Sequence, residues 1–274
     1  MFDRALRLVD FRHRYWARYD GARVPKRIMP NRLHKLGRRI IEQEHDGFPV
    51  LEFHPKSGRA DGRVVALHGG GYVAEASSAH FSAYCRLADL TGVQVTAPLY
   101  PLAPFHTPVQ VREWVLGYLA TLVGPHRLLG DSAGGNLALQ VTASGVDVER
   151  MVLWSPWLDV GASNPQILAR DGACALLPAK GMREFGAMYH GASNPSDPML
   201  SPLFRESETL PPTLVISGEQ DLLHPDISAW SAKRAGQGAP VELHAEPGVW
   251  HDYMLLPTPE AKRALAMTAS FLRT

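Results

Sequence analysis

The sequence has few cysteines and no long apolar segment. Its 274 residues include two cysteines, Cys85 and Cys174, whose separation matches no metal-site or disulfide-framework spacing. We therefore expect a reduced, cytoplasmic protein. A membrane-spanning helix needs roughly 18 consecutive apolar residues, and no window approaches that length. Asp3 and Arg4 interrupt the region that would be apolar in a secretory signal peptide, so we expect neither a signal nor an integral membrane segment.

The motifs of metal-dependent and phosphoryl-transfer enzymes are also missing. HExxH, Walker A and paired CxxC patterns do not occur, so we expect no metal and no cofactor. The composition is otherwise that of an ordinary globular protein, with a formal net charge of +1.

Positive charge is concentrated near the N-terminus. Residues 1–40 hold twelve Lys or Arg and three Asp, which leaves the rest of the chain acidic overall. Such a basic amphipathic segment could bind anionic lipid or nucleic acid. Because no nucleic-acid motif accompanies the charge, we favour the packing of Leu6, Val9 and Trp16 on the main domain, and we expect no nucleic-acid partner.

From about residue 48, short apolar runs alternate with helical stretches. The runs predict buried strands at 63–68, 93–100, 126–130, 150–155, 213–218 and 241–246. The stretches between them have helical spacing and end at glycines, which suit helix C-termini. This alternation predicts an α/β fold with a mostly parallel sheet flanked by helices. In such sheets the chemistry lies in loops beyond the C-terminal ends of the strands.

One long gap interrupts the alternation. Nearly sixty residues rich in Pro, Gly and Ser separate the strand ending near Ser155 from the one starting at Thr213, and long excursions of this kind are usually functional. We expect a core of residues 46–157 and 208–274, with a cap formed by an insertion at 158–207 and by the basic segment 1–45.

The sequence GDSAG at residues 130–134 fits the pattern G-x-S-x-G. In that pattern a sharp strand-to-helix turn exposes a serine nucleophile, and the flanking glycines leave room for the turn. An apolar run leads into this sequence and a helical stretch leads out, as the motif requires. Ser132 is therefore the candidate nucleophile.

A serine hydroxyl needs a base that removes its proton. His251, in EPGVWHDYM, follows the last predicted strand and lies in a glycine-containing loop. Other histidines lie within a predicted strand, abut prolines or begin elements, and we expect them to be structural or exposed: His54, His106, His126, His224 and His244.

The base in turn needs an orienting carboxylate. The loop after the preceding strand offers Glu219, Asp221 and Asp226. We favour Asp221, just past the strand end, over Asp226, which follows Pro225 and suits the first turn of a helix. The resulting order of serine, acid and histidine is that of α/β-hydrolases.

Acyl transfer also needs donors to the oxyanion. The sequence LHGGGY at residues 67–72 follows an earlier predicted strand, and loops of this type supply backbone amides together with the residue after the nucleophile. The candidate donors are Gly70, Gly71 and Ala133.

The same glycine run permits a different interpretation. Gly69, Gly71 and Ala74 match G-x-G-x-x-A after a strand, with Asp89 further along the chain, so a dinucleotide site is formally possible. We disfavour it because it leaves the other three elements unexplained and does not open a two-halved nucleotide fold.

Together, HGGGY, GDSAGG, Asp221 and His251 resemble the hormone-sensitive-lipase-like family of α/β-hydrolases. LYPLAP at 99–104 and SNPSDPMLSPLF at 193–204 are also similar to that family's sequences. The resemblance implies an eight-stranded sheet, a helical cap, a Ser132, His251 and Asp221 triad, and a monomer or homodimer. Pro101, Phe105 and the Glu75-Ala76 pair depart from the family pattern around the pocket.

These observations predict a serine carboxylesterase that hydrolyses short-chain esters through an acyl-enzyme. We expect Tyr72, Trp154, Trp157 and Trp250 to wall the substrate pocket. An acyltransferase or amidase would use the same triad, and a non-catalytic small-ligand receptor on the same fold is the alternative of another class. If the pKa of His251 is unperturbed, kcat/KM should rise near pH 6.5.

Overall fold

The computed structural model describes residues 18–23, 25–58 and 62–273. Within that part of the chain, no helix is both long and apolar enough to cross a membrane. The expected packing of Leu6, Val9 and Trp16 lies outside the described residues.

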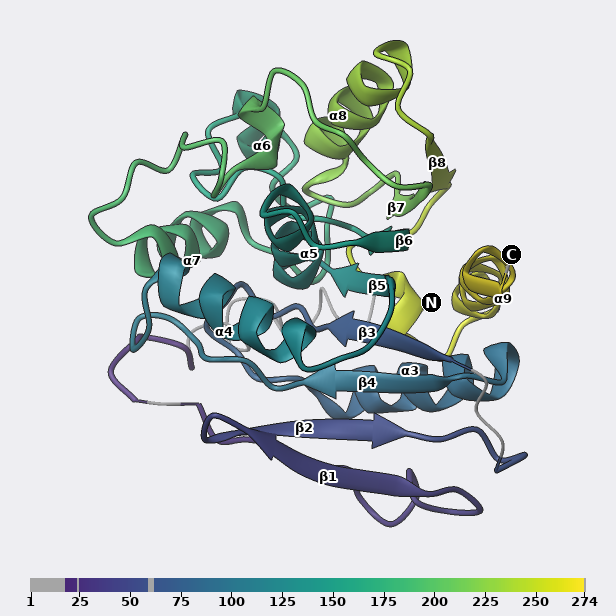
Figure 1. Cartoon of the computed structure of the whole chain (residues 1–274). Coiled ribbons are helices and arrows are strands. Elements are labelled where there is room, and N and C mark those ends of the chain that lie inside the picture. Colours follow the sequence, from purple (N-terminus) through teal and green to yellow (C-terminus); the bar gives the residue numbers. More distant parts are fainter. Residues whose placement is uncertain (1–17, 24, 59–61, 274) are drawn as a thin grey trace.

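Eight strands form one mixed sheet in the order β1-β2-β4-β3-β5-β6-β7-β8 (Figure 1). Strands β1 and β2 form an antiparallel hairpin, and β2 is antiparallel to β4. The six strands β3 to β8 are mutually parallel. Their bounds are Ile40–His45, Phe48–Phe53, Arg63–Leu67, Gln94–Pro98, His126–Asp131, Val148–Trp154, Thr213–Gly218 and Val241–Glu246, for β1 to β8. The expected α/β fold with a mostly parallel eight-stranded sheet is confirmed.

The six strands predicted from apolar runs are β3 to β8, and their ends agree within a few residues. Strands β1 and β2 were not individually predicted. The domain boundaries expected from the sequence place residues 40–45 in the N-terminal segment. These residues belong to the sheet, because β1 pairs with β2 along its whole length. The structural start of the core therefore lies before residue 46.

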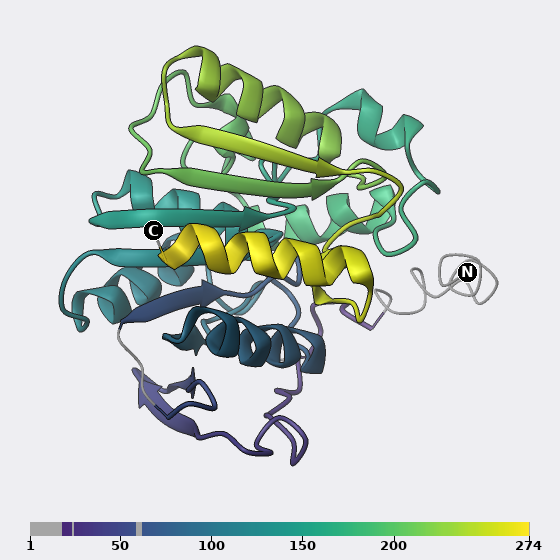
Figure 2. The same ribbon diagram turned by 90° about the vertical axis from the view of Figure 1, so that its right-hand side faces the viewer.

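Helices cover both faces of the sheet. One face carries α3 (Ser78–Thr91) and α9 (Pro259–Arg273), which pack together (Figure 2). The other face carries α4 (Pro108–Ala120), α5 (Ala133–Ala143) and α8 (His224–Gly236). Two buried apolar clusters, one on each face, hold these layers to the sheet.

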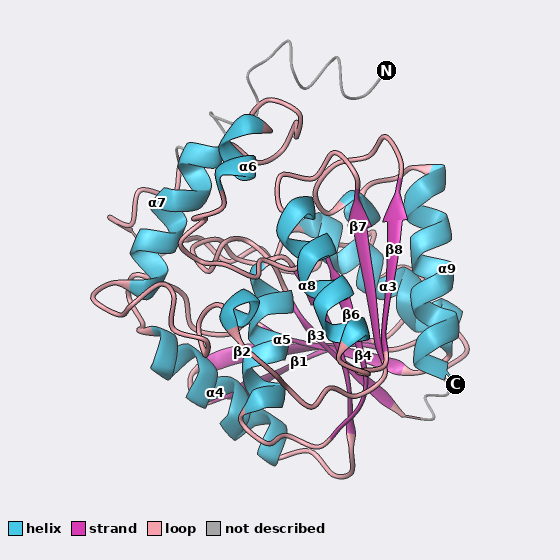
Figure 3. Ribbon diagram, turned by 90° about the horizontal axis from the view of Figure 1, so that it is seen from above, coloured by secondary structure: helices cyan, strands magenta, loops and turns pink. Residues whose placement is uncertain are grey.

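The residues between β6 and β7 form a separate group of short elements beside the C-terminal ends of the strands. They include α6 (Pro165–Ala169), α7 (Ala179–His190) and the 3-10 turn η1 (Pro202–Phe204). Seen from above, α6 and α7 lie to one side of the sheet and its flanking helices (Figure 3).

Candidate active site

Ser132 lies on the sharp turn between β5 and α5. Its backbone has φ 51° and ψ −115°, a conformation that L-residues rarely adopt. A Cβ at Gly134 would lie 1.9 Å from the carbonyl oxygen of Leu67, and one at Gly130 would lie 2.4 Å from that of Gly134. The turn therefore requires glycine at both positions, as the GDSAG motif predicts.

Asp221 and His251 meet at the C-terminal ends of β7 and β8. His251 Nδ1 lies 3.0 and 2.9 Å from the two carboxylate oxygens of Asp221, and both side chains are buried. Asp226 is placed elsewhere, because it lies in the first turn of α8 and its Oδ1 accepts a hydrogen bond from Asn164 Nδ2 at 2.6 Å. The geometry brings together the acid and base that the sequence favours.

The other ring nitrogen of His251 has a second acidic neighbour. Nε2 lies 3.1 Å from Oδ2 of Asp252, and among the described residues no hydrogen bond joins Ser132 to His251. Burial alone would lower the pKa of His251, but the carboxylates of Asp221 and Asp252 outweigh it and raise that pKa well above its usual value.

The candidate oxyanion donors lie on two neighbouring loops. Gly70 and Gly71 have φ of 119° and 61°, and within the described chain their N–H groups donate to no protein acceptor. Ala133 is the first residue of α5, where a helix leaves its N–H groups unpaired. The three candidate donors thus lie at a glycine turn and at a helix start, where N–H groups are commonly left unpaired.

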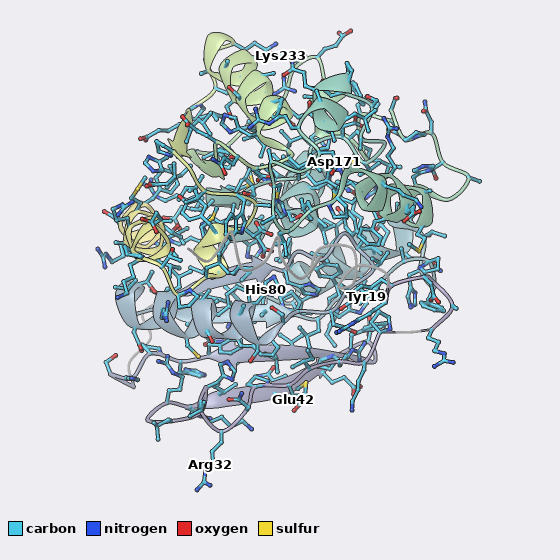
Figure 4. All side chains as sticks on the ribbon, turned by 180° about the vertical axis from the view of Figure 1, so that it is seen from behind. Tyr19, Arg32, Glu42, His80, Asp171 and Lys233 are labelled. Carbon is cyan, nitrogen blue, oxygen red and sulfur yellow. The ribbon has the colours of Figure 1, made fainter. Side chains whose placement is uncertain are left out.

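Asp131, next to the nucleophile, joins these loops. Its Oδ2 accepts from the N–H of Gly69 at 2.8 Å and lies 3.0 Å from Nε2 of His80, which comes from the first turn of α3 (Figure 4). Nδ1 of His80 accepts from the N–H of Ser77 at 3.0 Å, so the proton of the neutral ring lies on Nε2 and is donated to Asp131. Sequence analysis did not identify His80, because no local signal links α3 to the GDSAG turn.

Of the four aromatic residues predicted to wall the pocket, Trp154 lies apart. Its indole N–H donates to Thr268 of α9 at 3.0 Å, and it packs in the cluster between the sheet and α3 and α9. Tyr72, Trp157 and Trp250 belong to the cluster on the opposite face.

Tyr72 follows the glycine run and connects it to α5 and α7. Its hydroxyl donates to Asn136 Oδ1 at 2.7 Å, and its ring stacks on Tyr189 with centroids 3.6 Å apart. Gln140 Nε2 donates to Asn136 Oδ1 and to the hydroxyl of Tyr189. This buried polar network ties α7 to the loop that carries the candidate oxyanion donors.

Glu75, one of the departures from the family pattern, pairs with the described part of the N-terminal region. Arg27 Nε donates to its Oε1 at 3.0 Å, and Arg27 also lies over the ring of Phe48. Burial raises the pKa of Glu75 to about 7, although Arg27 opposes the shift. The residue therefore anchors residues from before β1 beside the glycine run.

Strained backbone is concentrated at this edge of the sheet. Non-glycine residues with positive φ follow four of the parallel strands, β3 to β8: Tyr72 after β3, Ser132 after β5, Ser155 after β6 and Asp252 after β8. Such residues cluster at functional sites.

Two residues of the possible dinucleotide-binding motif, Gly69 and Asp89, have other contacts in the structure. The Gly69 N–H is used by Asp131, and both carboxylate oxygens of Asp89 bind the guanidinium of Arg38. Among the described residues, no group of three His, Cys, Asp or Glu side chains is arranged to hold a metal ion.

Comparisons with known proteins agree with this fold. Residues 64–255 match the model of a family described as having the alpha/beta hydrolase fold. A triacylglycerol lipase of Mycobacterium tuberculosis is 32% identical over 81% of this chain, and this match covers 48% of the lipase. An acetyl-hydrolase of Streptomyces hygroscopicus is 31% identical over 79% of this chain and 77% of its own.

Solved structures give the same result. The crystal structure of an esterase from the bacterial hormone-sensitive lipase family is 27% identical, has a TM-score of 0.80, and is matched over 90% of this chain and 86% of its own. The chain therefore belongs to the α/β-hydrolase family, and within it to the hormone-sensitive-lipase-like group.

Proposed function

We propose that this chain is a serine carboxylesterase that hydrolyses short-chain carboxylic esters through an acyl-enzyme. The observation that carries the proposal is the buried pair of His251 and Asp221 at the same sheet edge as the strained turn of Ser132. A histidine oriented by a carboxylate is the base that a serine nucleophile needs.

The proposed reaction has two halves. In the first, Oγ of Ser132 attacks the ester carbonyl while its proton moves to Nε2 of His251, and the amides of Gly70, Gly71 and Ala133 stabilise the oxyanion. The proton then passes to the departing alkoxide oxygen as the C–O bond breaks. In the second half, water attacks the acyl-enzyme with His251 as base and releases the carboxylic acid.

Crowding near the candidate oxyanion donors supports short acyl chains. A Cβ at Gly71 would lie 3.1 Å from the ring of Phe185 on α7, and Tyr72 and Trp157 are fully buried nearby. The relative named an acetyl-hydrolase points in the same direction. We propose that residues 158–207 act as the cap that limits the pocket, together with the segment before β1.

The test is hydrolysis of p-nitrophenyl acetate by the wild type, Ser132→Ala and Ser144→Ala. Ser144 is an exposed serine at the other end of α5, so its variant controls for serine removal. We expect a burst and turnover in the wild type and the control, and a loss of at least about 10³-fold in Ser132→Ala. Absence of turnover on a panel of esters from acetyl to dodecanoyl would contradict the proposal.

Transfer to an added alcohol and cleavage of the corresponding amides distinguish hydrolysis from the acyltransferase and amidase alternatives. The receptor alternative predicts ligand binding without any burst. The cytoplasmic location and the monomer or homodimer remain predictions.

A further inference from the structure

The reacting nitrogen of His251 faces a carboxylate that the triad does not use. Nε2, the atom that must accept the proton of Ser132, lies 3.1 Å from Asp252 Oδ2, while Nδ1 is held by Asp221. The imidazole therefore lies between two carboxylates. Both Asp252 and His251 are buried.

The backbone holds Asp252 in an uncommon conformation. Its φ and ψ are 49° and 33°, the left-handed region that Asp and Asn tolerate better than other L-residues. Its N–H donates to Oγ of Ser155 at 3.3 Å, and Ser155 itself has positive φ. The end of β6 thus fixes the peptide from which the Asp252 side chain projects towards His251.

The charges around this pair are mixed. Asp131 and Asp221 face Asp252 as like charges, and His251 and His80 face it as bases. Burial raises the pKa of Asp252 to about 6, and His251 opposes that shift.

The cap segment contributes a neutral neighbour. The thiol of Cys174 contacts the backbone of His251, and burial raises its pKa. Nε2 of His251 and Oδ2 of Asp252 are 3.1 Å apart, close enough to share one proton and to titrate as a coupled pair.

We infer that Asp252 sets the pH at which His251 can act as the base: its carboxylate engages Nε2 of His251 in the free enzyme and must release it before Ser132 can be deprotonated. The inference rests on the proposed function. The shared proton leaves to solvent, the Asp252 carboxylate moves off Nε2, and the lone pair of Nε2 then takes the Ser132 proton as the bond from Oγ to the acyl carbon forms.

The consequence is a reaction that needs a higher pH than an isolated histidine would require. The neutral imidazole is the active form, so kcat/KM rises as pH passes upward through the pKa of His251. An opposite charge within about 4 Å raises such a pKa by roughly 1 to 3 units. The rise of kcat/KM with pH, here called the acid limb of the pH profile, should therefore have its midpoint above about pH 6.5 in the wild type. The value of 6.5 is the one that the sequence alone suggests.

Two substitutions separate the charge of Asp252 from its occupancy of Nε2. Asp252→Asn and Asp252→Gly both remove the charge, and both residues tolerate the left-handed backbone. The Asn amide can still bind Nε2, whereas Gly leaves it free. Glu219→Gln, which removes an exposed carboxylate two residues from Asp221, is the matched control.

The experiment measures kcat/KM for p-nitrophenyl acetate from pH 5 to 9. We expect the acid limb to move down by about one pH unit in both Asp252 variants, which gives about tenfold higher activity at pH 6 than the wild type. We also expect the plateau at high pH to be higher for Gly than for Asn. An acid limb within 0.3 pH unit of the wild type in either variant, or an equal shift in Glu219→Gln, would overturn the inference.

A second readout does not depend on ester turnover. A fluorophosphonate forms a bond from phosphorus to Ser132 Oγ, expels fluoride and passes the serine proton to His251. Its rate of labelling should show the same shift in acid limb. A wild type that is labelled but hydrolyses no ester contradicts the proposed function alone, whereas labelling profiles that coincide in all variants contradict the role of Asp252 alone. NMR titration of the His251 ring in the wild type should give a pKa above 6.5, and a lower value would also contradict it.

Discussion

At the scale of the residue, Gly134 of the GDSAG turn has no room for a side chain. The α carbon of Gly134 faces backbone rather than side chains: an added Cβ would lie 1.9 Å from the oxygen of Leu67 and 2.6 Å from that of His68. Backbone at the end of β3 cannot move away without breaking its pairing with β5.

Gly134→Ala should therefore destabilise the fold by at least about 3 kcal/mol, towards the upper end of overpacking effects. The control is Gly236→Ala at the end of α8, where an added Cβ meets nothing within 4 Å. That change should be neutral or stabilise by up to about 1 kcal/mol. Urea unfolding of the two variants checks the difference, and equal stabilities would contradict the packing argument.

The residues predicted from sequence are those whose position along the chain determines their place in space. Ser132, Asp221 and His251 each follow a strand, and parallel strands bring their C-terminal ends to one edge. His80 could not be predicted in this way, because its contact with Asp131 depends on how α3 packs on the sheet over β2 and β4. Asp252 is next to His251 in sequence, but the direction of its side chain is set by a left-handed backbone that the sequence does not reveal.

At the scale of the element, α7 links the cap region to the candidate oxyanion loop. Phe185 packs against Gly71, and Tyr189 stacks on Tyr72 and shares its network with Gln140. A change in the position of α7 should therefore alter both the size of the pocket and the donors to the oxyanion.

Phe185→Leu tests the first of these effects. The smaller side chain opens space beside Gly71, so the ratio of kcat/KM for p-nitrophenyl octanoate to that for the acetate should rise about tenfold. A stability loss of about 1 to 3 kcal/mol is expected. Phe53→Leu, a buried change in the cluster on the other face of the sheet, should lower stability without changing the ratio. An unchanged ratio in Phe185→Leu would place the acyl group elsewhere.

Prediction of strands from apolar runs succeeded for β3 to β8 and failed for the hairpin of β1 and β2. The strands β3 to β7 consist mainly of buried residues, whereas β1 reads IIEQEH and has three exposed residues in succession. Its pairing with β2, rather than its own composition, makes it a strand. The place of Trp154 at a strand end predicts a pocket residue, but side chains alternate between the faces of a sheet, and this one faces α9.

At the scale of the whole molecule, the pair of Arg27 and Glu75 ties the chain before the sheet to the catalytic edge. The carboxyl group of Glu75 has a folded-state pKa of about 7, against about 4.3 in an unfolded chain. The folded state therefore binds this proton more tightly than the unfolded state. Its contribution to stability is fully present below pH 4 and is lost as pH rises to 7.

Glu75→Gln removes this loss. The free energy of unfolding of the variant, minus that of the wild type, should increase by about 2 to 3 kcal/mol when the pH is raised from 5 to 8. The measurement is urea unfolding at both pH values, with Glu42→Gln in the exposed part of β1 as the control. A difference between variant and wild type that does not change with pH would show that Glu75 keeps an ordinary pKa.

The four residues with positive φ at the ends of β3, β5, β6 and β8 also bear on how the molecule opens. Each such conformation costs on the order of 1 to 3 kcal/mol, and the energy is supplied by the two apolar clusters that hold the rest of the sheet. The amides of these turns should exchange with solvent deuterium through local openings of lower free energy than those of the central strands. Substitutions that relax the turns at Tyr72, Ser132 and Ser155 should then slow exchange while reducing turnover, so selection for a more rigid enzyme would act against its chemistry.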